Sequence, residues 1–273
     1  KITVLAIETS ADETSAAIGQ GDTVKKTFQL LSHVIYSQIQ THAKTGGIVP
    51  EVAARAHIPK IVPVIRRALA KAGAQLRQID AIAVTSGPGL ITSLMVGVDT
   101  AKALAFALDK PIIPINHLEG HLLSSLFTPP LIPPPQGEGK KKKISSPLVG
   151  GGKVGVNFPA LGLVVSGGHT LLVLIKAIGH YKILGQTLDD AAGECFDKTA
   201  KLLGLPYPGG PALSELAKRG NANAIDFPRP MIDSKNFNFS FAGLKTSVLY
   251  FLRDHPSLNP SPSRGGKNTK KIP

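Results

Sequence analysis

Residues 2–18 read ITVLAIETSADETSAAI, and this stretch decides the fold. Ile2–Ile7 is a short apolar run, which is typical of a buried strand. A turn of Thr, Ser, Asp and Glu residues follows it, and Ser15–Ile18 predicts a second strand. The chain is therefore expected to open as a strand, a polar turn and another strand.

The rest of the body alternates between strand and helix patterns, which predicts an α/β fold. Apolar runs predict strands at Ala81–Thr85, Pro111–Ile115, Leu161–Val165 and Leu171–Ile175, the last two forming a hairpin. Helical spacing predicts helices at Val49–Ala72, Leu90–Leu108, Asp189–Leu203, Pro211–Arg219 and Ser240–Leu252. Pro59 and Pro63 should break or kink the first helix near its middle, and Gly73 should cap its end.

The composition favours a folded protein of one large domain or two small ones. The chain has 273 residues, of which 42% are hydrophobic and 18% charged. One cysteine, Cys195, allows no internal disulfide, which favours a reducing compartment. The most apolar stretch, Leu90–Leu108, carries Asp99 and Lys102, and the N-terminal residues do not resemble a signal peptide. We expect a cytoplasmic protein with no membrane partner.

Two stretches differ in composition from the body. Residues 129–158 are rich in Pro, Gly and Lys and carry a net charge of +4, and we expect a disordered insertion there. The Pro/Ser/Gly/Lys residues 256–273 are expected to form a disordered tail. The whole chain has a formal charge of +13, and a basic body remains without these stretches. Attraction to a polyanion and an ordinary solvated surface both explain such a charge.

The sharpest chemical signal is the motif Asn116-His117-Leu118-Glu119-Gly120-His121. It follows a predicted strand and opens a helix, where residues i and i+4 share a face, so His117 and His121 can bind one metal ion. Two ordinary surface histidines are the alternative. Glu119 would point about 200° away from His117 around the helix, which is poor geometry for a metalloprotease base. A third ligand would come from elsewhere, with His42, His57 and His169 as candidates.

Other motifs carry weaker signals. The turn Ser166-Gly167-Gly168 can bring backbone N–H groups close to an anion, although a plain hairpin turn explains it too. The acidic loop Glu8–Ser15 suits phosphates with a bridging cation, or is simply polar. On a helix, Asp190, Glu194 and Asp197 of the segment Asp189–Lys198 would share one face. The first two are also explained as acids favoured near a helix start. Tyr207–Pro211 could present free N–H groups to a phosphate or a sugar hydroxyl. We interpret Cys195 as a small buried filler.

Taken together and in order, eight motifs resemble the family of tRNA threonylcarbamoyladenosine transferases, the TsaD group. The motifs are Ile7–Ser10, Gly46–Glu51, Ser86–Leu90, His117–His121, Val165–Thr170, Gly193–Lys198, Tyr207–Pro211 and Phe239–Thr246. The resemblance covers residues 1–128 and about 159–254. It implies an actin-like ATPase fold with a first lobe at 1–128 and a second lobe at 159–255.

The resemblance also implies a reaction and a site. The threonylcarbamoyl group of threonylcarbamoyl-AMP would be transferred to N6 of adenosine 37 in tRNAs that read codons beginning with A. His117 and His121 would bind Fe²⁺ or Zn²⁺, and Asp12 would be the catalytic carboxylate. The substrate-binding residues would be Val164, Val165, Ser166, Gly167, Gly168, Asp197 and Gly210. The family's partners are a paralogous TsaB-like subunit and a small TsaE-like ATPase.

The family pattern continues beyond the last motif, with an Asn-bearing glycine loop and an Asp that is the third metal ligand. Here the sequence turns into the tail at Pro256, so we expect an incomplete second lobe and a metal held weakly by two protein ligands. Two other functions remain open. One is a metalloendopeptidase, the family's older label, and the other is a non-catalytic chain that binds the paralogous subunit.

Overall fold

The structure is a computed structural model that describes residues 1–24, 27–127 and 158–256. Contacts divide these residues into two units, namely residues 1–38 with 48–127 and residues 39–47 with 158–256. The predicted insertion at 129–158 and the predicted tail at 256–273 lie almost entirely outside the described residues. The predicted domain boundaries therefore stay predictions.

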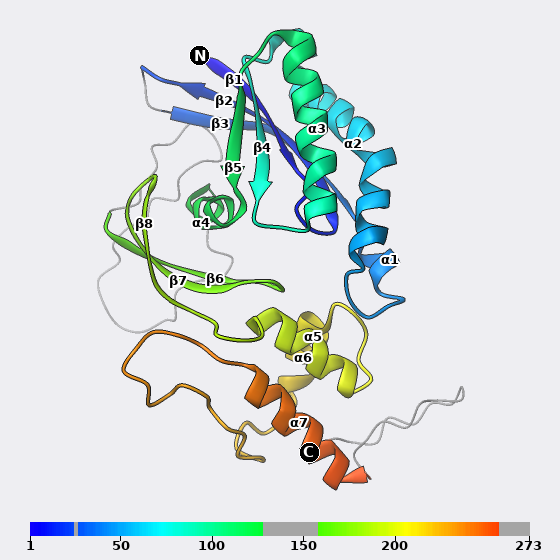
Figure 1. Ribbon diagram of the computed structural model, residues 1–273, viewed down its shortest axis with the longest axis vertical. Helices are drawn as coiled ribbons and strands as arrows, with labels where there is room; N and C mark the ends of the chain where they lie inside the picture. The colour runs from blue at the N-terminus through cyan, green and yellow to red at the C-terminus, as the bar shows by residue number, and fades with distance from the viewer. Residues whose placement is uncertain (25–26, 128–157, 257–273) are drawn as a thin grey trace. The chain divides into compact units, whose positions relative to one another are not determined.

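The first unit is built on a five-stranded mixed sheet in the order β3-β2-β1-β4-β5 (Figure 1). The central strand β1 pairs antiparallel with β2 and parallel with β4, and β4 pairs parallel with β5. The strand bounds are Ile2–Glu8 for β1, Glu13–Asp22 for β2, Thr27–Ser37 for β3, Ala81–Gly87 for β4 and Ile112–Asn116 for β5. The predicted opening hairpin and the predicted α/β class are confirmed. β3, which no predicted strand anticipates, extends the sheet beyond β2.

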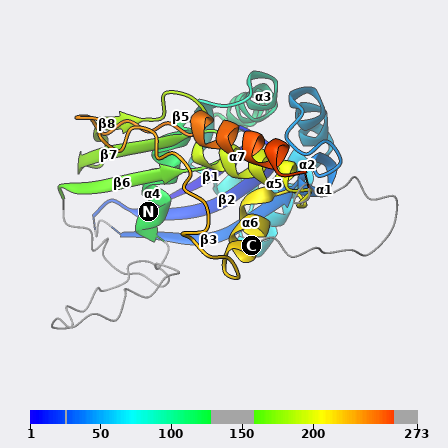
Figure 2. The ribbon, with the colours of Figure 1, turned by 90° about the horizontal axis from the view of Figure 1, so that it is seen from below.

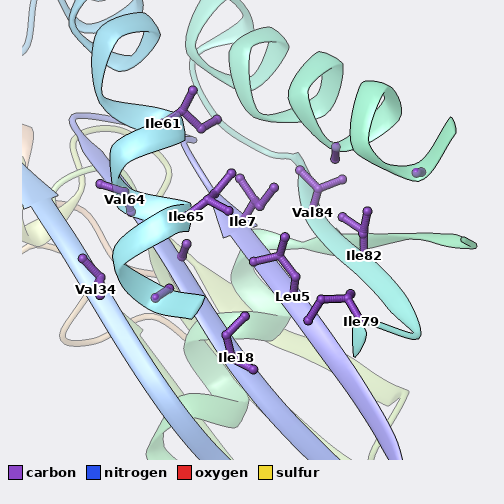
Figure 3. Packing of buried hydrophobic residues seen from close by; sticks show 14 residues of the cluster. Leu5, Ile7, Ile18, Val34, Ile61, Val64, Ile65, Ile79, Ile82 and Val84 are labelled. Carbon is purple, nitrogen blue, oxygen red and sulfur yellow. The ribbon is translucent and has the colours of Figure 1, made fainter. Parts of the chain in front are cut away.

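Two long helices, α2 (Pro50–Ala72) and α3 (Ile91–Leu108), pack on each other and against this sheet (Figures 1 and 2). Between α2 and the sheet lies an apolar core, and Figure 3 shows Leu5, Ile18 and Ile65 within it. Each such side chain contributes about 1.5–3 kcal/mol when it is fully buried. A short 3-10 helix, η1 (Leu76–Gln78), leads from α2 into β4. This core holds the ends of β1 and β4 at fixed positions.

Pro59 and Pro63 do not break helix α2, which runs without interruption from Pro50 to Ala72, and the kink that is the other predicted effect stays a prediction. Each proline removes one backbone donor, and the two carbonyls left without that donor are those of Arg55 and Pro59. Both prolines lie on the exposed side of the helix, where water can bond these carbonyls. Gly73 caps the helix with a left-handed φ of 62°, as predicted.

The helix α3 is long and apolar enough to cross a membrane by length and mean hydropathy, which is 1.5. The core helix of a soluble protein passes the same test, so this finding is weak evidence for a membrane span. Here Gly97, Ala101 and Ala105 are buried on one side of the helix. That side packs against the sheet and α2.

The second unit contains a three-stranded antiparallel sheet in the order β6-β7-β8, and Figure 2 shows these strands side by side. Its strands are β6 (Ala160–Val165), β7 (Thr170–Ala177) and β8 (His180–Gln186), and its helices are α1 (Ile39–His42), α5 (Ala192–Leu202), α6 (Gly209–Ala217) and α7 (Ala242–Asp254). The predicted β6–β7 hairpin is confirmed, with Val165 opposite Thr170. Helix α5 begins at Ala192 rather than at the predicted Asp189, because residues 187–190 form a turn in which the Thr187 hydroxyl donates to the Asp190 carbonyl.

Candidate functional site

The two predicted metal ligands meet at the start of helix α4 (His117–Phe127), directly after β5. The Asn116 side-chain oxygen accepts hydrogen bonds from the backbone N–H groups of Leu118, at 2.9 Å, and Glu119, at 3.3 Å. This cap fixes where the helix begins. His117 and His121 then lie one turn apart, and their Nε2 atoms are 3.0 Å apart. The expected shared face is confirmed.

The other ring nitrogen of His117 faces the end of β1. His117 Nδ1 lies 3.3 Å from Glu8 Oε2 and 3.1 Å from the Ser10 hydroxyl oxygen. The Glu8 carboxylate also accepts the Thr85 hydroxyl at its Oε2 and the Ser10 backbone N–H at its Oε1, each at 2.5 Å. Three strand and helix ends, those of β1, β4 and α4, therefore converge on one carboxylate.

The pKa of Glu8 is lowered from 4.5 to about 2. Burial by itself raises this pKa, but the hydrogen bonds from His117, Ser10 and Thr85 favour the charged form and outweigh it. Glu8 is therefore an anion at neutral pH and a weak base. The sequence patterns did not assign this role to Glu8, because its partners Thr85 and His117 lie 77 and 109 residues away along the chain.

The geometry of His117 and His121 fits a metal ion, whereas the number of ligands among the described residues does not. Two imidazole Nε2 atoms this close can both reach one ion at about 2.0–2.1 Å, and the Glu8–His117 contact is the second interaction that metal-binding histidines usually have. Within residues 1–24, 27–127 and 158–256, however, no group of three His, Cys, Asp or Glu side chains could hold a metal ion. The assignment of His117 and His121 as metal ligands stays a prediction.

The candidate third ligands have other positions. His57 is fully buried, where its Nδ1 lies 2.8 Å from the Thr14 hydroxyl and its Nε2 lies 3.1 Å from the Ala11 carbonyl oxygen. Both of its nitrogens thus serve the fold. His42 and His169 belong to the second unit. Within the first unit, His57 does not complete the pair.

Asp12, the predicted catalytic carboxylate, lies in the turn between β1 and β2. Its backbone carbonyl accepts a hydrogen bond from the Gln38 N–H at 3.1 Å. The side-chain atoms that lie beside His117 Nδ1 are Glu8 Oε2 and the Ser10 hydroxyl oxygen. Its catalytic role stays a prediction.

In the second unit the predicted substrate residues Val164 to Gly168 form the end of β6 and the turn into β7. The Ser166 N–H donates to the His169 carbonyl at 2.9 Å, and the His169 N–H donates to the Ser166 hydroxyl at 3.0 Å, which closes the turn. The Ser166 carbonyl accepts the Gly193 N–H at 3.1 Å, so the turn is tied to the start of α5. Val164 is buried and anchors the strand, whereas Val165 is 55% exposed.

Gly167, Gly168 and Gly210 share one property, which Gly47 and Gly120 also have. A Cβ atom at any of them would meet no other atom within 4 Å, and none has the left-handed φ that requires glycine. The fold therefore does not need glycine at these three positions. Glycine there leaves open space beside backbone N–H groups, which suits close approach by a ligand.

The other two predicted substrate residues, Asp197 and Gly210, lie beside each other at the contact between α5 and α6. Asp197 Oδ1 accepts the Gly209 N–H at 2.7 Å and so satisfies one free donor at the start of α6. The neighbouring Gly210 is the open position described above. Asp197 thus has a structural bond in addition to its predicted role.

The expectation that Asp190, Glu194 and Asp197 share one helix face is wrong for Asp190, which precedes α5. Asp190 instead binds the ammonium groups of Lys245, at 2.5 Å, and Lys198, at 3.4 Å. Burial raises the pKa of Asp190, but the two lysines lower it by a larger amount, so the pKa lies below its usual value. This acidic pair has a structural role, since Asp189 likewise accepts the backbone N–H groups of Phe241 and Ala242 at the start of α7.

Two further features of the second unit bear on the predictions. Cys195 is buried, and burial raises the pKa of its thiol. Its Sγ contacts the Phe241 carbonyl oxygen at 3.6 Å, which agrees with a packing role.

A cavity of about 780 Å³ is lined mainly by the irregular segment 222–241. It is lined by apolar, amide and hydroxyl side chains and by the charged residues Asp226 and Arg229, and none of the predicted substrate residues lines it.

The fold and the histidine pair define an α/β protein with a candidate metal centre at the carboxyl end of a mixed sheet. Residues 29–136 and 146–259 match the family model described as TsaD, tRNA N6-adenosine threonylcarbamoyltransferase, and the chain belongs to that family. Membership confirms the predicted family and its actin-like α/β fold.

The curated relatives carry the name tRNA N6-adenosine threonylcarbamoyltransferase. The protein from Ralstonia pickettii is 51% identical over 250 residues, which are 92% of this chain and 64% of the relative. The protein from Geotalea uraniireducens is 48% identical over 93% of this chain and 65% of its own length. The chain thus spans just under two thirds of these relatives.

Among solved structures, YeaZ from Pseudomonas aeruginosa is 24% identical with a TM-score of 0.30, and the match covers 42% of this chain and 43% of that one. Component A of (R)-2-hydroxyglutaryl-CoA dehydratase from Acidaminococcus fermentans is 14% identical with a TM-score of 0.45. That match covers 93% of this chain and 70% of the dehydratase component.

Proposed function

We propose that the chain takes part in the transfer of the threonylcarbamoyl group from threonylcarbamoyl-AMP to N6 of adenosine 37 in tRNAs that read codons beginning with A. Family membership supports this proposal, since the relatives carry the name of that enzyme. The observation that carries it is the pair of Nε2 atoms of His117 and His121, 3.0 Å apart, with Glu8 behind His117.

His117 and His121 would hold Fe²⁺ or Zn²⁺. When bound, the ion would act as a Lewis acid toward the carbamoyl group and fix the adenylate. Glu8 holds the His117 ring in place through Nδ1. The protein's own contribution in the first unit is therefore to orient two imidazole rings.

In the second unit, the backbone at Gly167, Gly168 and Gly210 would bind the adenylate. The reaction forms a bond between N6 and the carbamoyl carbon and breaks the bond from that carbon to the phosphate oxygen, so AMP leaves and N6 loses a proton. The adenylate is already activated and needs little acid assistance, so orientation is the main requirement. Asp12 and Asp197 are the carboxylates we propose beside the substrate.

tRNA, a TsaB-like paralogous subunit and a TsaE-like ATPase are the partners we propose, with the cytoplasm as the location. A protease function has less support. The carboxylate in contact with His117 is Glu8, whose pKa of about 2 is far below the value that suits a general base at neutral pH.

The test is transfer from synthetic threonylcarbamoyl-AMP to unmodified tRNA, with the partner subunits supplied and the product measured by nucleoside mass spectrometry. We expect product with the wild-type chain, loss of at least about 100-fold with His121→Ala, and no change with His180→Ala, an exposed histidine on β8. Product that is unaffected by His121→Ala would contradict the proposal. Capture of the TsaB-like subunit without any product would instead favour the non-catalytic alternative.

A further inference from the structure

The tautomer of His117 follows from the groups around its Nδ1 atom. The Glu8 carboxylate accepts the Thr85 hydroxyl and the Ser10 N–H, and an ionised carboxylate can only accept hydrogen bonds. Glu8 Oε2 lies 3.3 Å from Nδ1, and without a proton on Nδ1 a lone pair would face this negative oxygen. The proton of the neutral ring therefore belongs on Nδ1. The Ser10 oxygen, 3.1 Å away, can accept part of the same hydrogen bond.

The carboxylate itself is held by the fold. It receives the Thr85 hydroxyl from β4 and the Ser10 N–H from the turn after β1. The Ser10 backbone is held in turn, because its carbonyl accepts the Leu90 N–H at 2.8 Å. Gly89 packs closely against Ser10, since a Cβ at Gly89 would lie only 2.7 Å from the Ser10 carbonyl oxygen. Glu8 can thus impose an orientation on His117 rather than adapt to it.

A proton on Nδ1 leaves the lone pair on Nε2, the atom that faces His121 Nε2. We propose that Glu8 is a positioning residue that fixes His117 in the Nδ1–H tautomer, so that its Nε2 lone pair is presented beside His121. Thr85 and Ser10 act through Glu8 by holding its carboxylate in place. The use of that lone pair for a metal rests on the proposed function, whereas the tautomer does not.

The experiment is nitrogen-15 NMR of the histidine rings in the full, metal-free chain at neutral pH, with the His117 signals assigned from a His117→Gln variant. The expected result is an Nδ1–H ring at His117 in the wild-type chain and in Glu13→Gln. Glu13→Gln is a matched control, because it makes the same substitution at an exposed glutamate, at the start of β2. Glu8→Gln should shift His117 toward the Nε2–H form, which free histidine prefers.

A wild-type His117 in the Nε2–H form would overturn the proposal, and this result needs no variant to fold. An Nδ1–H ring that persists in Glu8→Gln would overturn it as well. Thr85→Val is a milder variant that should give an intermediate mixture of tautomers.

Titration with Zn²⁺ alone separates the two proposals. If Glu8 positions a metal ligand, Glu8→Gln should weaken Zn²⁺ binding by about 10- to 100-fold, and Glu13→Gln should not. If the tautomer behaves as expected but the wild-type chain does not bind Zn²⁺, the positioning role stands and the proposed metal function fails.

Discussion

Replacing Gly193 by alanine tests whether this residue fixes the turn that we propose binds the adenylate. A Cβ at Gly193 would lie 2.5 Å from the Ser166 carbonyl oxygen and 2.8 Å from the Gly167 nitrogen. Both are backbone atoms, so the turn itself must move. That movement would break the hydrogen bond from the Gly193 N–H to the Ser166 carbonyl.

The magnitude follows from opposing contributions. Alanine in place of glycine favours a helix by up to about 1 kcal/mol. Losing the hydrogen bond costs about 1 kcal/mol, and the overpacking costs about 1–3 kcal/mol. We therefore expect Gly193→Ala to lower the free energy of unfolding by about 2 kcal/mol, which corresponds to a fall in Tm of about 4–8 °C.

Gly167→Ala, in the same turn, should behave differently. A Cβ at Gly167 meets open space and no left-handed φ opposes it, so the free energy of unfolding should stay the same or rise by up to about 1 kcal/mol. The same substitution should weaken the binding of a non-hydrolysable adenylate analogue. Thermal unfolding of both variants, with Gly220→Ala as a neutral control, measures the contrast. A Gly193→Ala chain as stable as the wild type would refute the reasoning.

Three further outcomes are expected from other contacts. Asp197→Ala should cost about 1 kcal/mol in urea unfolding because the Gly209 N–H loses its acceptor, and Asp197→Asn should recover most of this. The lowered pKa of Glu8 stabilises the fold above about pH 4.5, and this contribution of about 2–3 kcal/mol should disappear as the pH falls toward 2, with a flatter pH profile in Glu8→Gln. His57→Leu should cost about 2–3 kcal/mol, measured by hydrogen exchange at the β1–β2 turn, because the Thr14 hydroxyl and the Ala11 carbonyl lose their buried partner.

The predicted elements are those whose signal lies in the local sequence. Buried strands such as β1 and β4 are short apolar runs, and α2 and α3 have apolar residues at helical spacing. The strands β3 and β8 do not follow from an apolar run, because polar residues interrupt both, such as Gln29 and His33 in β3 and Lys182 in β8.

The candidate site divides in the same way. The spacing of His117 and His121 predicts their shared face, because the helix alone creates it. The role of Glu8 depends on the pairing of β1 with β4 and on where α4 begins, and no local pattern contains that information. Asp190 was placed on a helix because acids often start one, whereas here it binds Lys198 and Lys245.

The measurement that tests the account most directly is equilibrium dialysis of the purified chain against saturating Fe²⁺ or Zn²⁺, with the bound metal measured by mass spectrometry. The account predicts about one ion per chain for the wild type and for His180→Ala, and almost none for the double variant His117→Ala with His121→Ala. Equal metal content in the wild type and the double variant would contradict it, because the ion would then be bound by other residues.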